Sequence, residues 1–386
     1  MIPYGRQDIS ETDVNEVIAV LKSDYLTQGP AVPAFEKSVA DYCGANYAFA
    51  VANATAALHI ACLALGLGKG DILWTSPVTF VASSNCGLYC GADVDFVDID
   101  SKTYNLSPAK LREKLVAAKE SGRLPKVVVA VHLCGQSCEM KELKALADEY
   151  GFSLIEDASH TIGGEYLGKP VGGCEYSDIT VFSFHPVKII TTGEGGMALT
   201  NCKKLATSME LLRSHGITRD PELMVGESDG GWYYQQLHLG FNYRMTDIQA
   251  ALGCSQMTRL DEFMAARRAI AKRYDAALAD VAVVTPWQHA DTTSAYHLYV
   301  IRLELDQISK THKEVFDELR ASGIGVNLHY MPVYRQPYYR EHGFADTHLA
   351  ESEKYYSEAI SLPMYSTLSE KDQQEVIQTL SRILGK

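Results

Sequence analysis

The chain has 386 residues, with 35 Lys or Arg against 48 Asp or Glu, so its formal net charge is −13. This length suggests two domains, or one large domain with a smaller one attached. The acidic balance argues against nucleic acid or an anionic membrane surface as the main partner, but it does not exclude a local basic pocket for a phosphorylated substrate.

The first residues contain no basic patch followed by an apolar stretch, and no run of about 18 apolar residues occurs further on. We therefore expect a soluble cytoplasmic protein. The nine cysteines are odd in number and include no C-x-x-C pair. Cys134 and Cys138 are not accompanied by a second cluster with ligand spacing, so we expect reduced core thiols and no metal site.

Helix signals and short apolar runs alternate along the first half of the chain. Ser10 is a predicted cap for a helix that runs to Leu21, Asn53 for a helix over 55–65, and Ser107-Pro108 opens a third. The predicted strands are compact apolar segments bounded by Gly, Pro and polar residues: 47–51, 72–74, 94–97, 127–133, 153–155, 179–184 and 197–200. This alternation predicts an α/β fold with a mostly parallel sheet covered on both faces. Ligands then bind at the carboxyl ends of the strands.

The last third of the chain has a different pattern. A long amphipathic stretch runs from Thr246 to about Leu278. It is followed by a predicted strand over 297–303, a helix over 314–319, a strand over 326–330 and a final helix over 370–384. We predict a large α/β domain over residues 1–250 and a helix-linked, smaller α+β domain over 251–386.

Lys188 lies in a turn after the apolar strand 179–184, five residues beyond Ser183. Partial burial there would lower the pKa of the amine and make it a nucleophile and a base. Asp157 follows the earlier strand 153–155, where a buried carboxylate is costly unless it is paired. This set fits pyridoxal 5′-phosphate (PLP): the amine forms a Schiff base, the carboxylate keeps the ring nitrogen protonated, and the hydroxyl helps to hold the phosphate.

Further candidates stand at the other strand ends. The start of the helix after Asn53 can bind a phosphate through free N–H groups, or it can be a well-capped core helix. Phe80 can stack on a pyridine ring, or it can belong to the core. His160 can contact the ring hydroxyl or Asp157, or it can be a polar residue at a helix start. His185 is a phosphate or substrate contact, or it braces the turn.

In this order, the motifs resemble those of the DegT/DnrJ/EryC1/StrS sugar aminotransferases, within fold-type I of the PLP enzymes, and the likeness covers nearly the whole chain. The motifs are Leu26-Thr-Gln-Gly29, Asn53-Ala-Thr-Ala-Ala57, Pro77-Val-Thr-Phe80, Glu156-Asp-Ala-Ser-His160, Ser183-Phe-His-Pro-Val-Lys188, Gly193-Glu-Gly-Gly196 and Gly240-Phe-Asn-Tyr-Arg244. Many members have Ser-Gly-Thr in place of Asn53-Ala54-Thr55, and many have glutamine in place of His160.

The resemblance assigns roles to these residues. It implies that Lys188 binds PLP and moves protons, with Asp157 on the ring nitrogen, His160 near the ring hydroxyl and Phe80 stacked on the ring. It places Ala54, Thr55, Ala56 and Ser183 at the phosphate. Asn242 resembles the residue that reaches the phosphate of the neighbouring subunit's site, so a homodimer with shared sites is expected. The candidate contacts to the sugar nucleotide are Tyr4, Tyr25, Leu26, Thr27, Gln28, His185, His329 and Tyr330.

Within the family, the chain is most similar to the aminotransferases of the pseudaminic acid pathway, on stretches such as 212–221, 232–236, 294–299 and 326–332. This resemblance implies transfer of the amino group of L-glutamate to C4 of a UDP-linked 4-keto-6-deoxy-N-acetylhexosamine, giving UDP-4-amino-4,6-dideoxy-N-acetyl-β-L-altrosamine. The alternatives are a different 4-amino sugar of the perosamine or bacillosamine type and a catalytically silent PLP-binding sensor or assembly partner. A nicotinamide oxidoreductase is weaker still, because no G-x-G-x-x-G follows a strand with an acidic residue about 20 positions on.

Overall fold

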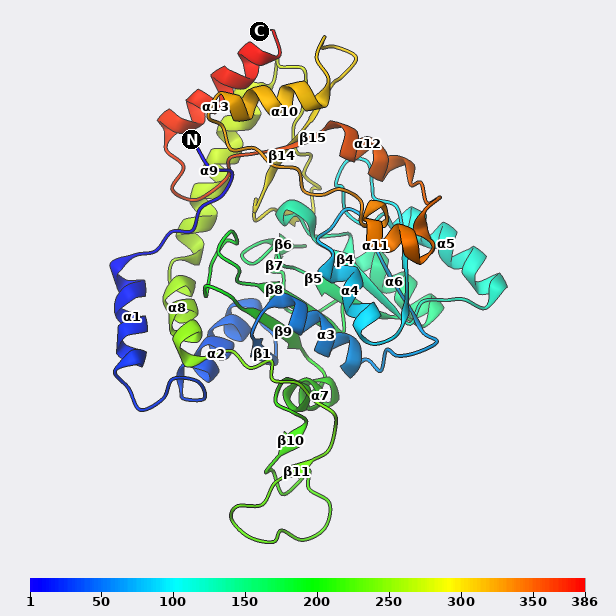
Figure 1. The fold of residues 1–386 in the computed structure, drawn as a ribbon, viewed down its shortest axis with the longest axis vertical. Helices are drawn as coiled ribbons and strands as arrows, with labels where there is room; N and C mark the ends of the chain where they lie inside the picture. Colours follow the sequence, from blue (N-terminus) through cyan, green and yellow to red (C-terminus); the bar gives the residue numbers. More distant parts are fainter. Residues whose placement is uncertain (386) are drawn as a thin grey trace.

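A seven-stranded sheet forms the centre of the computed structural model, which describes residues 1–385 (Figure 1). Its strands are β1 (Tyr47–Val51), β2 (Ile72–Thr75), β3 (Asp93–Phe96), β4 (Val127–Val131), β5 (Ser153–Asp157), β8 (Ile179–Ser183) and β9 (Gly196–Thr200). The order across the sheet is β1-β9-β8-β5-β4-β2-β3. The pairs from β3 to β8 are parallel, whereas β9 is antiparallel to both β8 and β1. The predicted α/β fold with a mostly parallel sheet is confirmed.

Helices cover both faces of this sheet. One face packs against α3 (Ala54–Ala64), α4 (Ala82–Tyr89) and α7 (Lys203–Arg213). The other face packs against α2 (Ala31–Cys43), α5 (Pro108–Ser121), α6 (Met140–Tyr150) and α8 (Asp247–Met257). At the N-terminal end of the chain, α1 (Glu11–Leu21) packs against α8.

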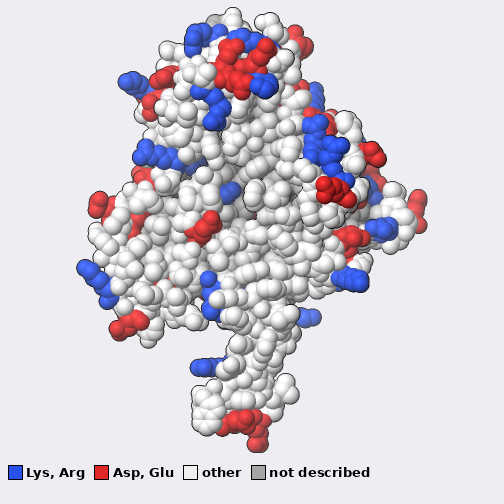
Figure 2. Space-filling model, viewed as in Figure 1, with Lys and Arg blue, Asp and Glu red and all other residues white. Residues whose placement is uncertain are grey.

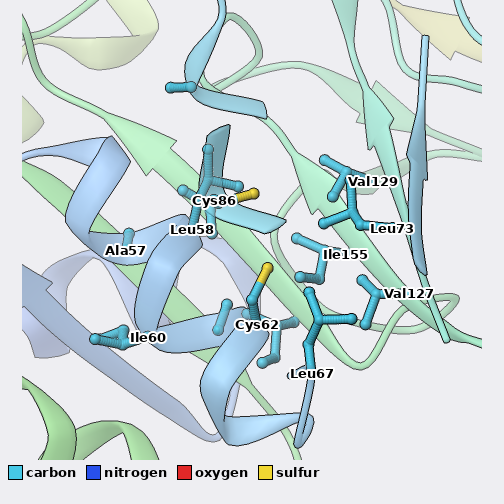
Figure 3. Close-up of a cluster of buried hydrophobic side chains, with 14 of the residues drawn as sticks. Ala57, Leu58, Ile60, Cys62, Leu67, Leu73, Cys86, Val127, Val129 and Ile155 are labelled. Carbon is cyan, nitrogen blue, oxygen red and sulfur yellow. The ribbon is translucent and has the colours of Figure 1, made fainter. Parts of the chain in front are cut away.

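Strand β4 shows why these strands read as unbroken apolar runs. Val127 and Val129 belong to the cluster under α3, with Leu58 and Cys62 (Figure 3). Val128 belongs to the cluster under α5 and α6. Because successive side chains of a strand point to opposite faces, a strand covered on both sides is apolar at every position.

A second, smaller unit is built on an antiparallel sheet of β12 (Val283–Val284), β14 (Tyr299–Leu303) and β15 (Ala359–Leu362). It packs against α9 (Leu260–Leu278), α10 (His312–Ala321) and α13 (Glu370–Ile383), while α12 (Ala350–Glu358) contacts β14. A capping box between Thr311 and Glu314 fixes the start of α10. A small sheet of β13 (Thr292–Thr293), β6 (Glu165–Tyr166) and β7 (Lys169–Pro170) links the two units.

One predicted element is wrong, and another consists of two helices. The amphipathic stretch 246–278 forms α8, which ends at Met257, and α9, which begins at Leu260. The segment 326–330 is no strand: it has one isolated bridge, Asn327 to Ser361, and then turns into the cavity described below. Its apolar residues are explained by burial of Val326 in the core of the smaller unit rather than by sheet pairing.

The domain division at residue 250 stays a prediction. The chain passes between the two units more than once, because Ile2 bridges Ile324 in the smaller unit. Val333 and the short helix α11 (Pro337–Tyr339) return to the core of the large unit, where Tyr339 packs with Phe96.

The segment after α7 projects from the large unit as an arm, which we define as residues 214–242 (Figure 1). It contains the short hairpin of β10 (Ile217–Thr218) and β11 (Gln235–Gln236). Its apolar side chains Val225, Trp232 and Leu239 are exposed, and acidic side chains gather at its tip (Figure 2). Among residues 1–385, none of the helices is long and apolar enough to cross a lipid bilayer.

Candidate active site

A cavity of about 1050 Å³ opens at the carboxyl ends of β5 and β8. Its other walls are the start of α3, the segment 79–83 and the segment 327–331. Twelve predicted site residues line it: Tyr4, Ala54, Thr55, Ala56, Phe80, Asp157, His160, Ser183, His185, Lys188, His329 and Tyr330. The parallel sheet gathers most of them because its strands end at one edge, whereas Tyr4, His329 and Tyr330 come from the N-terminal segment and the segment 327–331.

Lys188 projects into this cavity from the turn between β8 and β9, where its backbone N–H donates to the carbonyl of His185 at 2.8 Å. Burial of the amine lowers its pKa to about 8, and the carboxylate of Asp157 acts in the opposite direction. The amine therefore loses its proton more readily than the amine of an exposed lysine does. An uncharged amine can attack a carbonyl carbon and accept a proton.

Asp157 is the last residue of β5, and hydroxyl groups hold its carboxylate. Oδ1 accepts from the Ser159 hydroxyl at 2.6 Å and from the Ser159 backbone N–H at 3.2 Å. Oδ2 accepts from the Ser83 hydroxyl at 2.7 Å. A carboxylate fixed in this way suits a protonated pyridine nitrogen, since a charge-assisted hydrogen bond forms between them.

The start of α3 forms a cradle for an anion. The side chain of Asn53 caps the helix by accepting from the N–H of Ala56 at 2.9 Å, while Ala54 and Thr55 belong to the first turn, whose N–H groups have no intrahelical acceptor. Gly196 of β9 lies against this turn, because a Cβ there would be 2.5 Å from the Ala54 nitrogen. The residues present therefore fit the phosphate of PLP.

Three of the four histidines that line the cavity, His160, His297 and His329, are buried. His160 Nδ1 accepts from the Cys134 N–H at 3.3 Å, and the ring centroid of His160 lies 4.3 Å from that of His297. Burial and the nearby Lys188 hold the pKa of His160 well below its ordinary value. Burial and Lys188 also lower the pKa of His329 to about 4. These imidazoles are neutral at pH 7, so they act as hydrogen-bonding groups rather than as cations.

Aromatic groups form the rim. The Phe80 side chain is 59% exposed, and its ring centroid lies 6.3 Å from that of Tyr330. Tyr4 packs against His329 with centroids 5.3 Å apart. A flat ring that entered the cavity would cover the exposed face of Phe80, which is the arrangement expected of a stacking residue.

Five predicted site residues lie elsewhere in this chain. Thr27 and Gln28 line a separate hollow together with Arg219 and Arg244. The other three, Tyr25, Leu26 and Asn242, are exposed, and Asn242 forms a backbone bridge with Ser214 at the base of the arm.

The sequence-based prediction missed several residues that line the cavity, among them Ser83, Ser159, His297 and Asn327. Ser83 lies in the first turn of α4, three residues after Phe80 of the predicted motif 77–80, and that closeness was the signal available in the sequence. His297 is buried, and its Nδ1 has no hydrogen-bond partner in residues 1–385. No local pattern marks it.

Known relatives are similar to this chain over nearly its whole length. A UDP-4-amino-4,6-dideoxy-N-acetyl-β-L-altrosamine transaminase from Campylobacter jejuni is 37% identical over 100% of this chain and 98% of its own. A GDP-perosamine synthase from Caulobacter vibrioides is also 37% identical, over 92% of this chain and 91% of its own.

Solved structures agree with these relatives. Helicobacter pylori PseC, an aminotransferase involved in the biosynthesis of pseudaminic acid, has a TM-score of 0.91 at 29% identity, with 99% of both chains covered. The PLP form of Spr1654 from Streptococcus pneumoniae, a protein described as a sugar aminotransferase, has a TM-score of 0.87 at 26% identity. The similarity covers 99% of this chain and 98% of that one.

The sequence model of one aminotransferase family matches residues 7–381 of this chain. These residues include every residue of the cavity except Tyr4. The cofactor of this family is PLP, in agreement with the phosphate cradle, the Asp157 carboxylate and the Lys188 amine. The chain belongs to the DegT/DnrJ/EryC1/StrS aminotransferase family and is a PLP-dependent sugar aminotransferase.

Proposed function

We propose that this aminotransferase moves the amino group of L-glutamate to C4 of a UDP-linked 4-keto-6-deoxy-N-acetylhexosamine. The product is UDP-4-amino-4,6-dideoxy-N-acetyl-β-L-altrosamine, a precursor of pseudaminic acid. The observation that carries this proposal is the agreement of two independent comparisons, the Campylobacter jejuni transaminase in sequence and PseC in structure, each over 98% or more of both chains.

When bound, PLP supplies an electron sink that stabilises negative charge on the carbon that loses a proton. Lys188 takes the proton from the α-carbon of glutamate, because its lowered pKa leaves the amine free to accept one. Glutamate, having given up its amino group, leaves as 2-oxoglutarate. In the second half-reaction the same amine delivers a proton to C4 of the sugar. Asp157 holds the proton on the ring nitrogen, and the first turn of α3 binds the phosphate.

The two substrates occupy the site in turn, in a ping-pong order. The cavity has room for this, because about 1050 Å³ lies in front of Lys188. Tyr4, His185, His329 and Tyr330 line the cavity and are the proposed contacts to the sugar nucleotide.

A homodimer with shared active sites is part of the proposal. Asn242, at the base of the arm, is proposed to reach the phosphate in the partner's cavity. Thr27 and Gln28, in their separate hollow, are proposed to serve the partner's sugar nucleotide in the same way. The exposed Val225, Trp232 and Leu239 support this proposal, since an apolar arm of this kind is typical of a protein–protein contact.

A second candidate is a perosamine-type reaction on a GDP-4-keto sugar. The GDP-perosamine synthase supports it with the same identity as the altrosamine transaminase. The chemistry at Lys188 would be unchanged, so the candidates differ only in the sugar nucleotide.

The test is turnover of a panel of UDP-, GDP- and dTDP-linked 4-keto-6-deoxy sugars with L-glutamate as donor, followed by mass spectrometry of the products. We expect kcat/KM to be highest for the UDP-linked N-acetylhexosamine. A higher kcat/KM for the GDP-linked sugar would reject the UDP assignment and support the perosamine candidate. The Lys188→Ala variant controls for non-enzymatic amination.

A further inference from the structure

A chain of buried hydroxyl groups ends on the carboxylate of Asp157. Ser83 Oγ donates to Asp157 Oδ2 at 2.7 Å, and Ser83 Oγ and Thr79 Oγ1 are 2.9 Å apart. All three side chains are more than nine-tenths buried. A hydroxyl has one proton to donate. Because the Ser83 proton goes to Asp157, Thr79 must be the donor to Ser83, and the direction of the chain is fixed.

The two oxygens of Asp157 differ in what they already accept. Oδ1 accepts both donors of Ser159, whereas Oδ2 accepts from Ser83 alone within residues 1–385. An ionised carboxylate oxygen has room for about two hydrogen bonds. Oδ2 is therefore the oxygen that can accept one more, from a pyridine N–H.

The hydrogen-bonded hydroxyl groups of Thr79 and Ser83 also reach the rim of the cavity. Thr79 precedes the exposed Phe80, and Ser83 lies in the first turn of α4. The hydroxyl groups thus tie the segment that carries Phe80 to the end of β5. The Phe80 ring and the Asp157 carboxylate can contact the same pyridine ring only if their position relative to each other is fixed.

We propose that Ser83 is a positioning residue that holds Asp157 with Oδ2 turned toward the ring nitrogen of PLP and ties the Thr79-Phe80 segment to that carboxylate. Ser83 acts through Asp157, not on the reacting atoms. The proposal rests on PLP dependence and is independent of which sugar the enzyme uses.

The physical reason is the strength of a hydrogen bond to an ionised group, which contributes about 1.5–3 kcal/mol. Without the Ser83 hydroxyl, Oδ2 loses its buried donor and the carboxylate can rotate. The ring nitrogen then holds its proton less firmly, and the cofactor binds less tightly.

The test compares Ser83→Ala with Ser84→Ala in the full-length enzyme. Ser84 is the matched control, because it is equally buried on the same turn but bonds to the Val81 carbonyl and the Tyr339 hydroxyl. Three quantities are measured: the Kd of PLP, the ¹⁵N chemical shift of ring-labelled PLP across pH, and kcat and KM for glutamate.

For Ser83→Ala we expect a Kd about tenfold higher, a ¹⁵N shift moved toward the unprotonated ring, and a fall in kcat with little change in KM. Ser84→Ala should leave the ¹⁵N shift at the wild-type position even if it lowers the melting temperature. A Ser83→Ala enzyme with the wild-type Kd and ¹⁵N shift would overturn the proposal.

Ser159→Ala tests the choice of oxygen. It removes a donor from Oδ1, so its effect on the ¹⁵N shift should be smaller than that of Ser83→Ala. An equal or larger effect would overturn the assignment of Oδ2. Cofactor affinity and the ¹⁵N shift are measured without any sugar. A result that contradicts the role of Ser83 therefore says nothing against the proposed sugar substrate.

Discussion

Glu156 and Asp157 are consecutive residues of β5, and their carboxylates face opposite sides of the sheet. Glu156 Oε2 accepts from His132 Nε2 at 2.8 Å, and Oε1 accepts from the Ser177 hydroxyl at 2.5 Å. Asp157 instead lines the cavity. His132 Nδ1 accepts from the Cys138 N–H, so the proton of a neutral His132 lies on Nε2 and is donated to Glu156. The first carboxylate is thus structural, and the second is the proposed partner of the cofactor's ring nitrogen.

Glu156→Gln should destabilise the fold without changing the cavity. Burial alone raises the Glu156 pKa, but hydrogen bonds from His132, Ser177 and Thr180 outweigh burial and lower it below the ordinary value. This contribution is present above the unfolded pKa and is lost as pH falls through the lower folded pKa. We expect a loss of about 2 kcal/mol at pH 7.

Urea unfolding at pH 7 and at acidic pH measures this difference. The deficit of Glu156→Gln relative to wild type should shrink on acidification below about pH 4. The exposed Glu113→Gln is the control and should change stability by less than about 0.5 kcal/mol. A Glu156→Gln deficit that is constant with pH would contradict the ionised state of Glu156.

Lys188→Ala should abolish transamination while the protein still folds. A positioned proton-transfer group contributes about 10²–10⁴-fold in rate, and covalent attachment of PLP is lost as well. We expect turnover to fall by at least about 10³-fold, measured with glutamate and the preferred keto sugar. Lys188→Arg, which keeps the charge but cannot give up its proton, should be equally inactive. Substantial activity in either variant would remove Lys188 from its assigned role.

The rate at which cofactor-free enzyme binds PLP should rise with pH through about 8, because the Lys188 amine loses its proton there. Asp157 raises the Lys188 pKa, so Asp157→Asn should move the midpoint to lower pH. Stopped-flow absorbance between pH 6 and 10 would measure both midpoints. A wild-type midpoint near that of free lysine, about 10.4, would disagree with a buried amine.

The same pKa has a cost in stability. The folded pKa of Lys188 lies below the unfolded value, so the charged amine is disfavoured in the folded protein, and stability increases as pH rises from about 8 toward the unfolded value. Lys188→Met should therefore stabilise the cofactor-free protein at pH 7 by about 2 kcal/mol, less than the full shift implies because water in the open cavity screens the amine. Urea unfolding of both proteins without PLP measures this. No gain at pH 7 would contradict it.

Gly196→Ala should damage the phosphate cradle. Its Cβ would be 2.5 Å from both the Ala54 nitrogen and the Asn53 carbonyl carbon, which are backbone atoms and cannot move aside cheaply. We expect a loss of about 2–3 kcal/mol in stability and weaker PLP binding. Gly68→Ala is the control, since a Cβ there meets nothing within 4 Å. Equal PLP affinities in both variants would argue against close packing at this cradle.

Trp232→Glu should weaken the proposed homodimer. Trp232 is 75% exposed on the arm, and a charge there would oppose burial against a second copy. Light scattering across a range of concentrations would show dissociation, and activity should fall with it. Val116→Glu, on the exposed face of α5, is the control. A Trp232→Glu dimer as tight as wild type would exclude the arm from the interface.

Local patterns in the sequence predict the fold class and much of the layout of the cavity. Seven apolar runs and their caps are local signals, and each predicted run overlaps a strand of the central sheet. Polar residues at or shortly after the ends of such runs, among them Asp157 and Lys188, meet at one edge of a parallel sheet. These inferences need only short-range patterns and one rule of topology.

Tertiary structure alone decided which of these groups touch. The Ser83–Asp157 hydrogen bond joins residues 74 positions apart, and His297, just before β14, packs against His160. The segment 326–330 has a strand-like composition, but it finds one bridge and a cavity wall instead of a sheet. Such contacts depend on the packing of whole elements against one another, and the free energy of that packing is not encoded in any local stretch of the chain.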